Sequence, residues 1–201
     1  MRLTRDVAMV GGGDNGFNLS APADGNIYLI DGGTEFALVD AGMGSVLSDT
    51  ELILNNIRDA GVDPVSIGSL LLTHYHGDHA GGAADLRDAI GFEAHGSPLT
   101  ADVMSRGDTE LNAVAYAKSL GGLPPEYEFR ALPCLGDLVD AHVFNIGRLQ
   151  VTVYETPGHC AGHLSFLVEG GERSYLISGD LVFHGGKIVN QYIWDNSIPD
   201  Y

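Results

Sequence analysis

Three histidines lie within six residues of one another, directly after a short apolar run. The run covers residues 69–73 and leads into His74-Tyr-His-Gly-Asp-His79. A run of this kind is consistent with a buried strand, which places the histidines at the end of that strand. Neutral imidazole and carboxylate groups suit a borderline divalent ion such as zinc. We therefore interpret the segment as part of a metal site; the alternative is a polar loop with solvated histidines.

The spacing of these side chains predicts two neighbouring metal positions. His74 and His76 are spaced to point the same way, whereas Asp78 and His79 would diverge toward a second point. Two metals that share a bridging hydroxide lie about 3.5–4 Å apart, a separation that such a divergence can span. Because a catalytic zinc usually takes three protein ligands, the remaining ligands must come from distant segments.

Two later strand ends offer such ligands. His159 lies in the turn Pro157-Gly-His159, after a predicted strand at residues 149–154, and a Pro-Gly turn can bring the backbone close to a ligand. Asp180 follows a predicted strand at residues 174–177, and its carboxylate could bridge both ions. Each candidate ligand therefore follows a strand.

The first half of the chain alternates strands and helices. Residues 26–30 and 36–39 are predicted to form a hairpin. The sequence Ser48-Asp-Thr-Glu51 is a capping box that starts a helix ending before Gly61. The apolar face of this helix is predicted to contain Thr50, Ile53, Leu54, Ile57 and Ala60.

Strands dominate the second half. The other predicted elements are helices at residues 81–90 and 108–120, the latter capped by Asp108, and strands at 92–95, 149–154, 163–168 and 174–177. Residues 97–130 are expected to form a lid-like insert that shapes a pocket. Together these predicted helices and strands indicate an α/β fold, in which helices cover the sheets.

The amino-acid composition limits the kinds of partner that the protein can bind. The chain has 201 residues, 27 Asp and Glu against 10 Lys and Arg, and 44% hydrophobic residues, which predicts one folded acidic domain over residues 1–201. So few basic residues argue against a nucleic-acid partner, and no run is long enough to span a membrane. No export signal is recognisable in the sequence. The two cysteines, Cys134 and Cys160, are too few for a disulfide framework, so we expect a cytoplasmic protein. The sequence does not indicate an oligomeric state.

Four motifs make the chain resemble the metallo-β-lactamase fold superfamily. They are Leu38-Val-Asp-Ala-Gly42, Thr73-His-Tyr-His-Gly-Asp-His-Ala-Gly-Gly82, Thr156-Pro-Gly-His159 and Ser178-Gly-Asp180, in the order and approximate spacing of that family. The resemblance covers residues from about 25 to 190 and implies a four-layer αββα sandwich.

The resemblance also implies ligand roles. His74, His76 and His159 would hold one metal, Asp78 and His79 the second, and Asp180 would bridge them, with Asp40 as a structural neighbour. In the family a later histidine completes the second metal, whereas after Asp180 this sequence has only His184. We therefore expect the chain to be the N-terminal portion of a longer protein that lacks its last strand and helices.

The expected chemistry is hydrolysis of a small-molecule ester, thioester or lactone by metal-bound hydroxide, similar to the glyoxalase II-like and lactonase-like branches. Two divalent ions are expected, zinc first, with iron or manganese as alternatives, and Asp78 would orient the nucleophile. The alternative function is that of a persulfide dioxygenase-like enzyme, in which His74, His159 and Asp180 hold one iron. A metal-binding protein without turnover is a third possibility.

Three further residues near the motifs have open roles. His163 could orient a ligand through a hydrogen bond or pack at a strand start. Cys160 is interpreted as a small residue in a tight loop, and His184, like His95 and His142, as a surface or turn residue.

Overall fold

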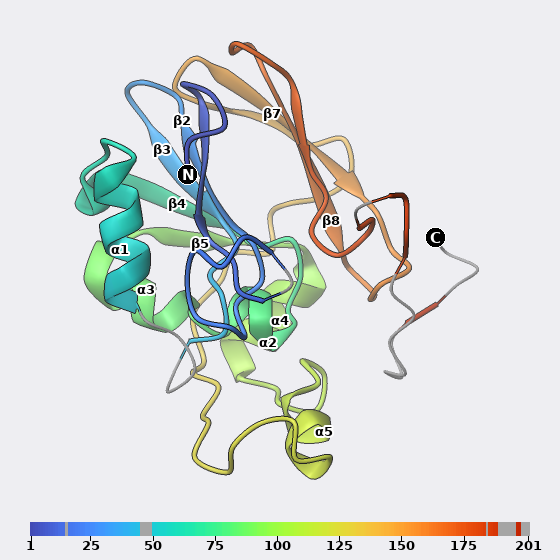
Figure 1. Ribbon diagram of the computed structural model, residues 1–201. Helices are drawn as coiled ribbons and strands as arrows, with labels where there is room; N and C mark the ends of the chain where they lie inside the picture. The colour runs from blue at the N-terminus through green and yellow to red at the C-terminus, as the bar shows by residue number, and fades with distance from the viewer. Residues whose placement is uncertain (15, 45–49, 184, 189–195, 198–201) are drawn as a thin grey trace.

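The chain forms two β-sheets that pack face to face, with helices on the first sheet (Figure 1). The computed structural model describes residues 1–14, 16–44, 50–183, 185–188 and 196–197. The first sheet has the strand order β1 Val7–Gly11, β2 Ile27–Asp31, β3 Phe36–Val39, β4 Ile67–Leu71 and β5 Glu93–His95. The second has the order β6 Val143–Ile146, β7 Leu149–Glu155, β8 Leu164–Glu169 and β9 Tyr175–Ile177.

The first sheet is mixed. The strands β1, β2 and β3 are antiparallel neighbours, whereas β3, β4 and β5 run parallel. Parallel neighbours need crossover connections, and helices supply them. Between β3 and β4 lie α1 Thr50–Asp59 and the short 3₁₀ helix η2 Pro64–Ser66; between β4 and β5 lie α2 Gly77–Ala80 and α3 Ala83–Ile90. In Figure 1, α1 and α3 cover the outer face of this sheet.

The predicted apolar face of α1 is confirmed. Ile53, Leu54 and Ile57 are buried against the outer face of the first sheet, in one cluster with Leu38 and Leu70. The predicted cap at Ser48 lies outside the described residues.

A second apolar cluster lies between the two sheets. The second sheet is antiparallel throughout, and its inward residues Val151, Val153 and Phe166 pack with Ile30 and Val39 of the first sheet. At the ends of β2 and β6 the sheets approach so closely that a Cβ on Gly32 would overlap the carbonyl of Ile146. This geometry confirms the predicted α/β fold with two packed sheets; in the described residues no helix follows β9.

Two predicted helices differ in extent from the structure. The helix predicted at 108–120 is reduced to α5 Val114–Ser119. Asp108 accepts hydrogen bonds from the backbone N–H groups of Glu110 and Leu111, as the predicted cap would, but it caps only a turn that ends before α5. Ala113, just before α5, has a left-handed backbone (φ 65°), which breaks any longer helix. The helix predicted at 81–90 begins only at Ala83, with α2 as a separate turn before it.

Five of the described elements were not predicted. They are β1, β6, the short helices η2 and α2, and the helix α4 Pro98–Arg106. Val103 and Met104 in α4 are fully buried, so the expectation that residues 97–130 form a lid is wrong for this part, which belongs to the body of the fold. No helix among the described residues is long and apolar enough to cross a lipid bilayer.

Candidate metal centre

The predicted ligands converge because each follows a strand of the sandwich. His74 lies in the loop after β4, and His76 is the residue from which α2 begins. His159 lies between β7 and β8, and Asp180 follows β9. Segments from both sheets thus supply side chains to one place.

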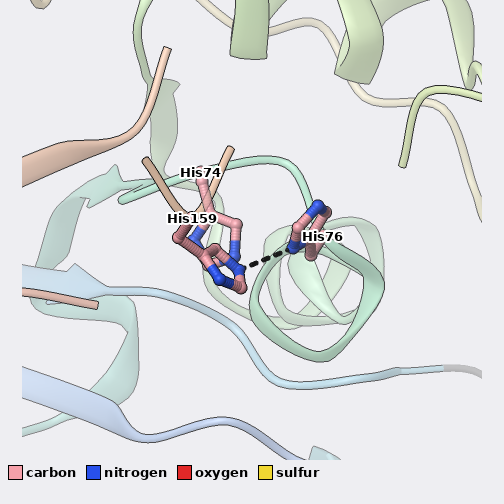
Figure 2. A group of neighbouring side chains, drawn as sticks. All are labelled: His74, His76 and His159. Atoms are coloured by element: carbon pink, nitrogen blue, oxygen red, sulfur yellow. Dashed lines mark hydrogen bonds between the residues drawn. The ribbon is translucent and has the colours of Figure 1, made fainter. Parts of the chain in front are cut away.

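The first cluster consists of His74, His76 and His159. One ring nitrogen of each lies within 4.8 Å of the others, and at most 4% of each residue is exposed. His76 Nδ1 and His159 Nε2 are 2.9 Å apart, the contact drawn as a dashed line in Figure 2. The three imidazole rings therefore face one another and not the solvent.

The second cluster consists of His74, His79 and Asp180, again with ligand atoms within 4.8 Å. His79 Nε2 lies 3.1 Å from Asp180 Oδ1, and His159 Nε2 lies 3.8 Å from the other carboxylate oxygen of Asp180. Asp180 thus touches both clusters, as a bridging carboxylate must. The two clusters also share His74, whereas the family resemblance implies that His74 serves the first metal alone.

Asp78 lies beside the clusters and belongs to neither. Its Oδ2 is 3.5 Å from His79 Nε2, and 44% of its side chain is exposed. It lines a cavity that also reaches His76. The structure therefore places Asp78 between the buried cluster and the solvent-accessible space.

A buried aspartate orients His79. Asp40 follows β3 in a left-handed backbone conformation (φ 63°). Its carboxylate accepts hydrogen bonds from the backbone N–H and the hydroxyl of Thr73, at 2.8 Å each, and contacts His79 Nδ1 at 2.8 Å. This arrangement directs His79 Nε2 toward Asp180 and fixes the tautomer of the ring.

A second set of hydrogen bonds supports Asp180. His163 is fully buried, and its Nε2 accepts a hydrogen bond from the backbone N–H of Asp180 at 3.3 Å. Its Nδ1 is 3.0 Å from the hydroxyl of Thr156, which in turn lies 2.8 Å from the hydroxyl of Ser165. His163 therefore holds the loop that carries Asp180, through a contact to the backbone.

Thr156→Val tests this support. The substitution keeps the shape of the side chain but leaves the buried His163 Nδ1 without its partner. We expect a loss of about 1–3 kcal/mol in the free energy of unfolding, measured by urea denaturation of metal-free protein. Thr152→Val, in the strand β7 that precedes Thr156, serves as the control and is expected to change stability by less than about 0.5 kcal/mol. Equal stability of the two variants would contradict the role given to Thr156.

Burial and charge set different protonation states in the two clusters. Burial lowers the pKa of His74 well below its ordinary value, and burial lowers the pKa of His159 to about 4. Both rings are thus neutral at pH 7, the form that binds metal. Burial also opposes the charged form of His79, but nearby carboxylates, chiefly Asp78 and Asp180, raise its pKa well above 6.5. A cation bound there would displace that proton.

The donor set fits a divalent ion. His74 Nε2 is buried and has no hydrogen-bond partner among the described residues, which is costly for a polar atom unless it has a ligand. The 2.9 Å between the nitrogens of His76 and His159 is close to the separation of about 3.3 Å expected for two nitrogens on one tetrahedral zinc. Neutral imidazoles with one carboxylate are the ligands that borderline ions prefer.

The remaining predicted residues lie elsewhere. His95 Nδ1 is 3.0 Å from Asp137 Oδ2, and His142 Nδ1 is 3.0 Å from the backbone carbonyl oxygen of Asp137. Both histidines thus contact Asp137 near the surface and lie outside the two clusters. Cys160 is buried and packs with Tyr75. His184 lies outside the described residues.

Comparison with known proteins agrees with this geometry. Residues 21–200 match the family model of the metallo-beta-lactamase superfamily. The atrochrysone carboxyl ACP thioesterase of Aspergillus terreus is 29% identical over 86% of this chain and 44% of its own length. The acyl-coenzyme A thioesterase MBLAC2 of Bos taurus is 30% identical over 88% of this chain and 64% of its own.

A solved structure shows the same fold. A metallo-beta-lactamase of Cronobacter sakazakii superposes with a TM-score of 0.72 at 21% identity, covering 100% of this chain and 72% of that one. The chain spans about half the length of the curated relatives that it matches. From the match over residues 21–200, with two packed sheets and histidines gathered at their ends, the chain belongs to the metallo-beta-lactamase superfamily.

Proposed function

We propose that the protein is a metal-dependent hydrolase that cleaves a small-molecule ester, thioester or lactone. The observation that carries this proposal is the pair of buried donor clusters that share His74 and are linked by Asp180. Two ions fit this arrangement, one held by His74, His76 and His159, the other by His79 and Asp180. Zinc suits these donors best, and iron or manganese are also compatible.

Bound divalent ions would supply hydroxide at neutral pH and polarise a carbonyl oxygen. The chain's own groups then position the reactants. Asp78, on the cavity wall beside His79, would accept a hydrogen bond from the attacking water and so orient it. Asp40 and His163 act behind the site, because they fix His79 and the Asp180 loop.

The relatives favour carbonyl substrates. Two of them are named as thioesterases, one acting on an acyl carrier protein thioester and one on acyl-coenzyme A. A thioester shares its carbonyl chemistry with esters and lactones, so all three remain in the proposal. Among the described residues Cys134 and Cys160 are not joined in a disulfide, which is consistent with the expected cytoplasmic location.

Metal analysis combined with substrate assays tests the proposal. We expect about two zinc-like ions per chain and hydrolysis of S-acyl-N-acetylcysteamine thioesters, 4-nitrophenyl esters or γ-lactones. Hydrolysis should disappear with a chelator and return with added zinc. One iron per chain, with oxygen consumption on a persulfide and no hydrolysis, would instead support the dioxygenase alternative.

A further inference from the structure

A cavity of about 690 Å³ opens beside His76 and Asp78. This size lies within the range of about 300–1,000 Å³ typical of small-molecule sites. Its far wall is formed by α5 and the segment after it, with apolar side chains from Val114, Leu120 and Leu123. Asp78 is the one formally charged residue among its described lining residues, which include neither Lys nor Arg.

The floor of the cavity depends on a glycine and a fixed methionine. A Cβ on Gly77 would lie 3.2 Å from the Cε of Met43 and 3.3 Å from Val114 Cγ2, so a side chain at this position would crowd the floor. The backbone of Met43 is held from both sides, because its N–H donates to Asp24 Oδ1 and its carbonyl accepts from the Tyr127 hydroxyl, at 2.8 Å each. The floor is thus preformed.

The rim carries exposed apolar surface. Leu120 is 68% exposed and Tyr116 is 45% exposed, both on the cavity side of the α5 segment. Exposed apolar side chains that border a cavity and rim a polar site are typical of a ligand-binding groove. They extend the apolar wall outward from the metal centre.

We propose that this cavity binds the acyl part of the substrate as an uncharged apolar chain or ring, and that α5 limits its length. The inference rests on the proposed hydrolase function, because the scissile carbonyl must lie at His76 and Asp78, where the cavity meets the clusters. An acyl group with its own carboxylate is disfavoured, since it would meet Asp78 and no basic residue. Each methylene buried in the cavity should raise kcat/KM about fourfold.

Substitutions in α5 test the role of the wall. Ala117 lines the cavity, whereas Ala115, on the same short helix, does not. We expect Ala117→Phe to lower the ratio of kcat/KM for 4-nitrophenyl octanoate over 4-nitrophenyl acetate at least about tenfold, the loss of roughly two methylenes of burial. Ala115→Phe should leave the ratio unchanged. Leu123→Ala, which enlarges the cavity, should shift the preference toward longer acyl chains.

A binding assay separates this inference from the function. Nile red, an uncharged apolar dye, should bind the metal-depleted protein, be displaced by octanol, and bind Ala117→Phe at least about tenfold more weakly than Ala115→Phe. If dye binding follows this pattern but no hydrolysis is detected, the proposed hydrolase function is contradicted and the proposal of an apolar binding cavity is supported. Metal-dependent hydrolysis with equal dye binding and equal chain-length ratios in both variants would overturn the acyl assignment and leave the function standing.

Discussion

Replacing His74 with alanine should remove the ion of the first cluster, weaken the ion of the adjoining second cluster, and lower kcat/KM of the proposed hydrolase at least about 10³-fold, which corresponds to about 4 kcal/mol of transition-state stabilisation. His74 is the one residue that belongs to both clusters. Its Nε2 is buried and unpartnered among the described residues, so a bound ion would be its partner. Metal content by elemental analysis and steady-state kinetics on the same preparation measure both effects.

Single-cluster variants make this prediction specific. His76→Ala should weaken the ion of the first cluster alone, and His79→Ala that of the second alone, because each belongs to one cluster. His142→Ala is the matched control, since this ring binds the carbonyl of Asp137 outside both clusters. A His74→Ala protein that kept two ions per chain would show that the shared position is not a ligand.

The strand-end logic explains why these side chains could be expected to converge. A residue that follows a buried strand emerges at the edge of its sheet, so His74, His159 and Asp180 were expected to meet, and the structure brings them together. Asp78 could not be placed in this way. It lies in α2, and adjacent helical residues point about 100° apart, so Asp78 faces the cavity while His79 turns inward.

The elements that were missed divide into two kinds. The strand β1 is buried at all five positions, and such a run carries no alternation that distinguishes a strand from other apolar segments. For α4 the signals were present: Ser97 caps its first turn, Pro98 starts it and Gly107 ends it with a left-handed backbone. The strand β1 could not be predicted because its sequence carries no distinguishing pattern. The helix α4 was not predicted because the segment was expected to form a lid.

Asp40→Asn should weaken the second ion about 10–100-fold while the protein stays folded. Asparagine adopts left-handed backbone conformations more readily than most residues, and φ at this position is 63°. The asparagine Oδ1 can still accept a hydrogen bond from the Thr73 N–H. Its amide NH₂ then faces His79 Nδ1, which in the unaltered protein lies 2.8 Å from a carboxylate oxygen of Asp40. The imidazole must then accept at Nδ1 and carry its proton on Nε2, the atom that faces Asp180.

Flipping the asparagine amide does not restore the original hydrogen bonds, because it would place the NH₂ group against the Thr73 N–H, with two donors facing each other. Isothermal titration of metal-free protein with zinc measures the change: the affinity of the second binding step should fall and that of the first should stay. Asp40→Ala serves as the comparison. It leaves Thr73 and His79 without an acceptor and should cost about 3–5 kcal/mol of stability. If Asp40→Asn bound both ions as the unaltered protein does, Asp40 would not control the tautomer of His79, and its buried hydrogen bonds would serve the fold alone.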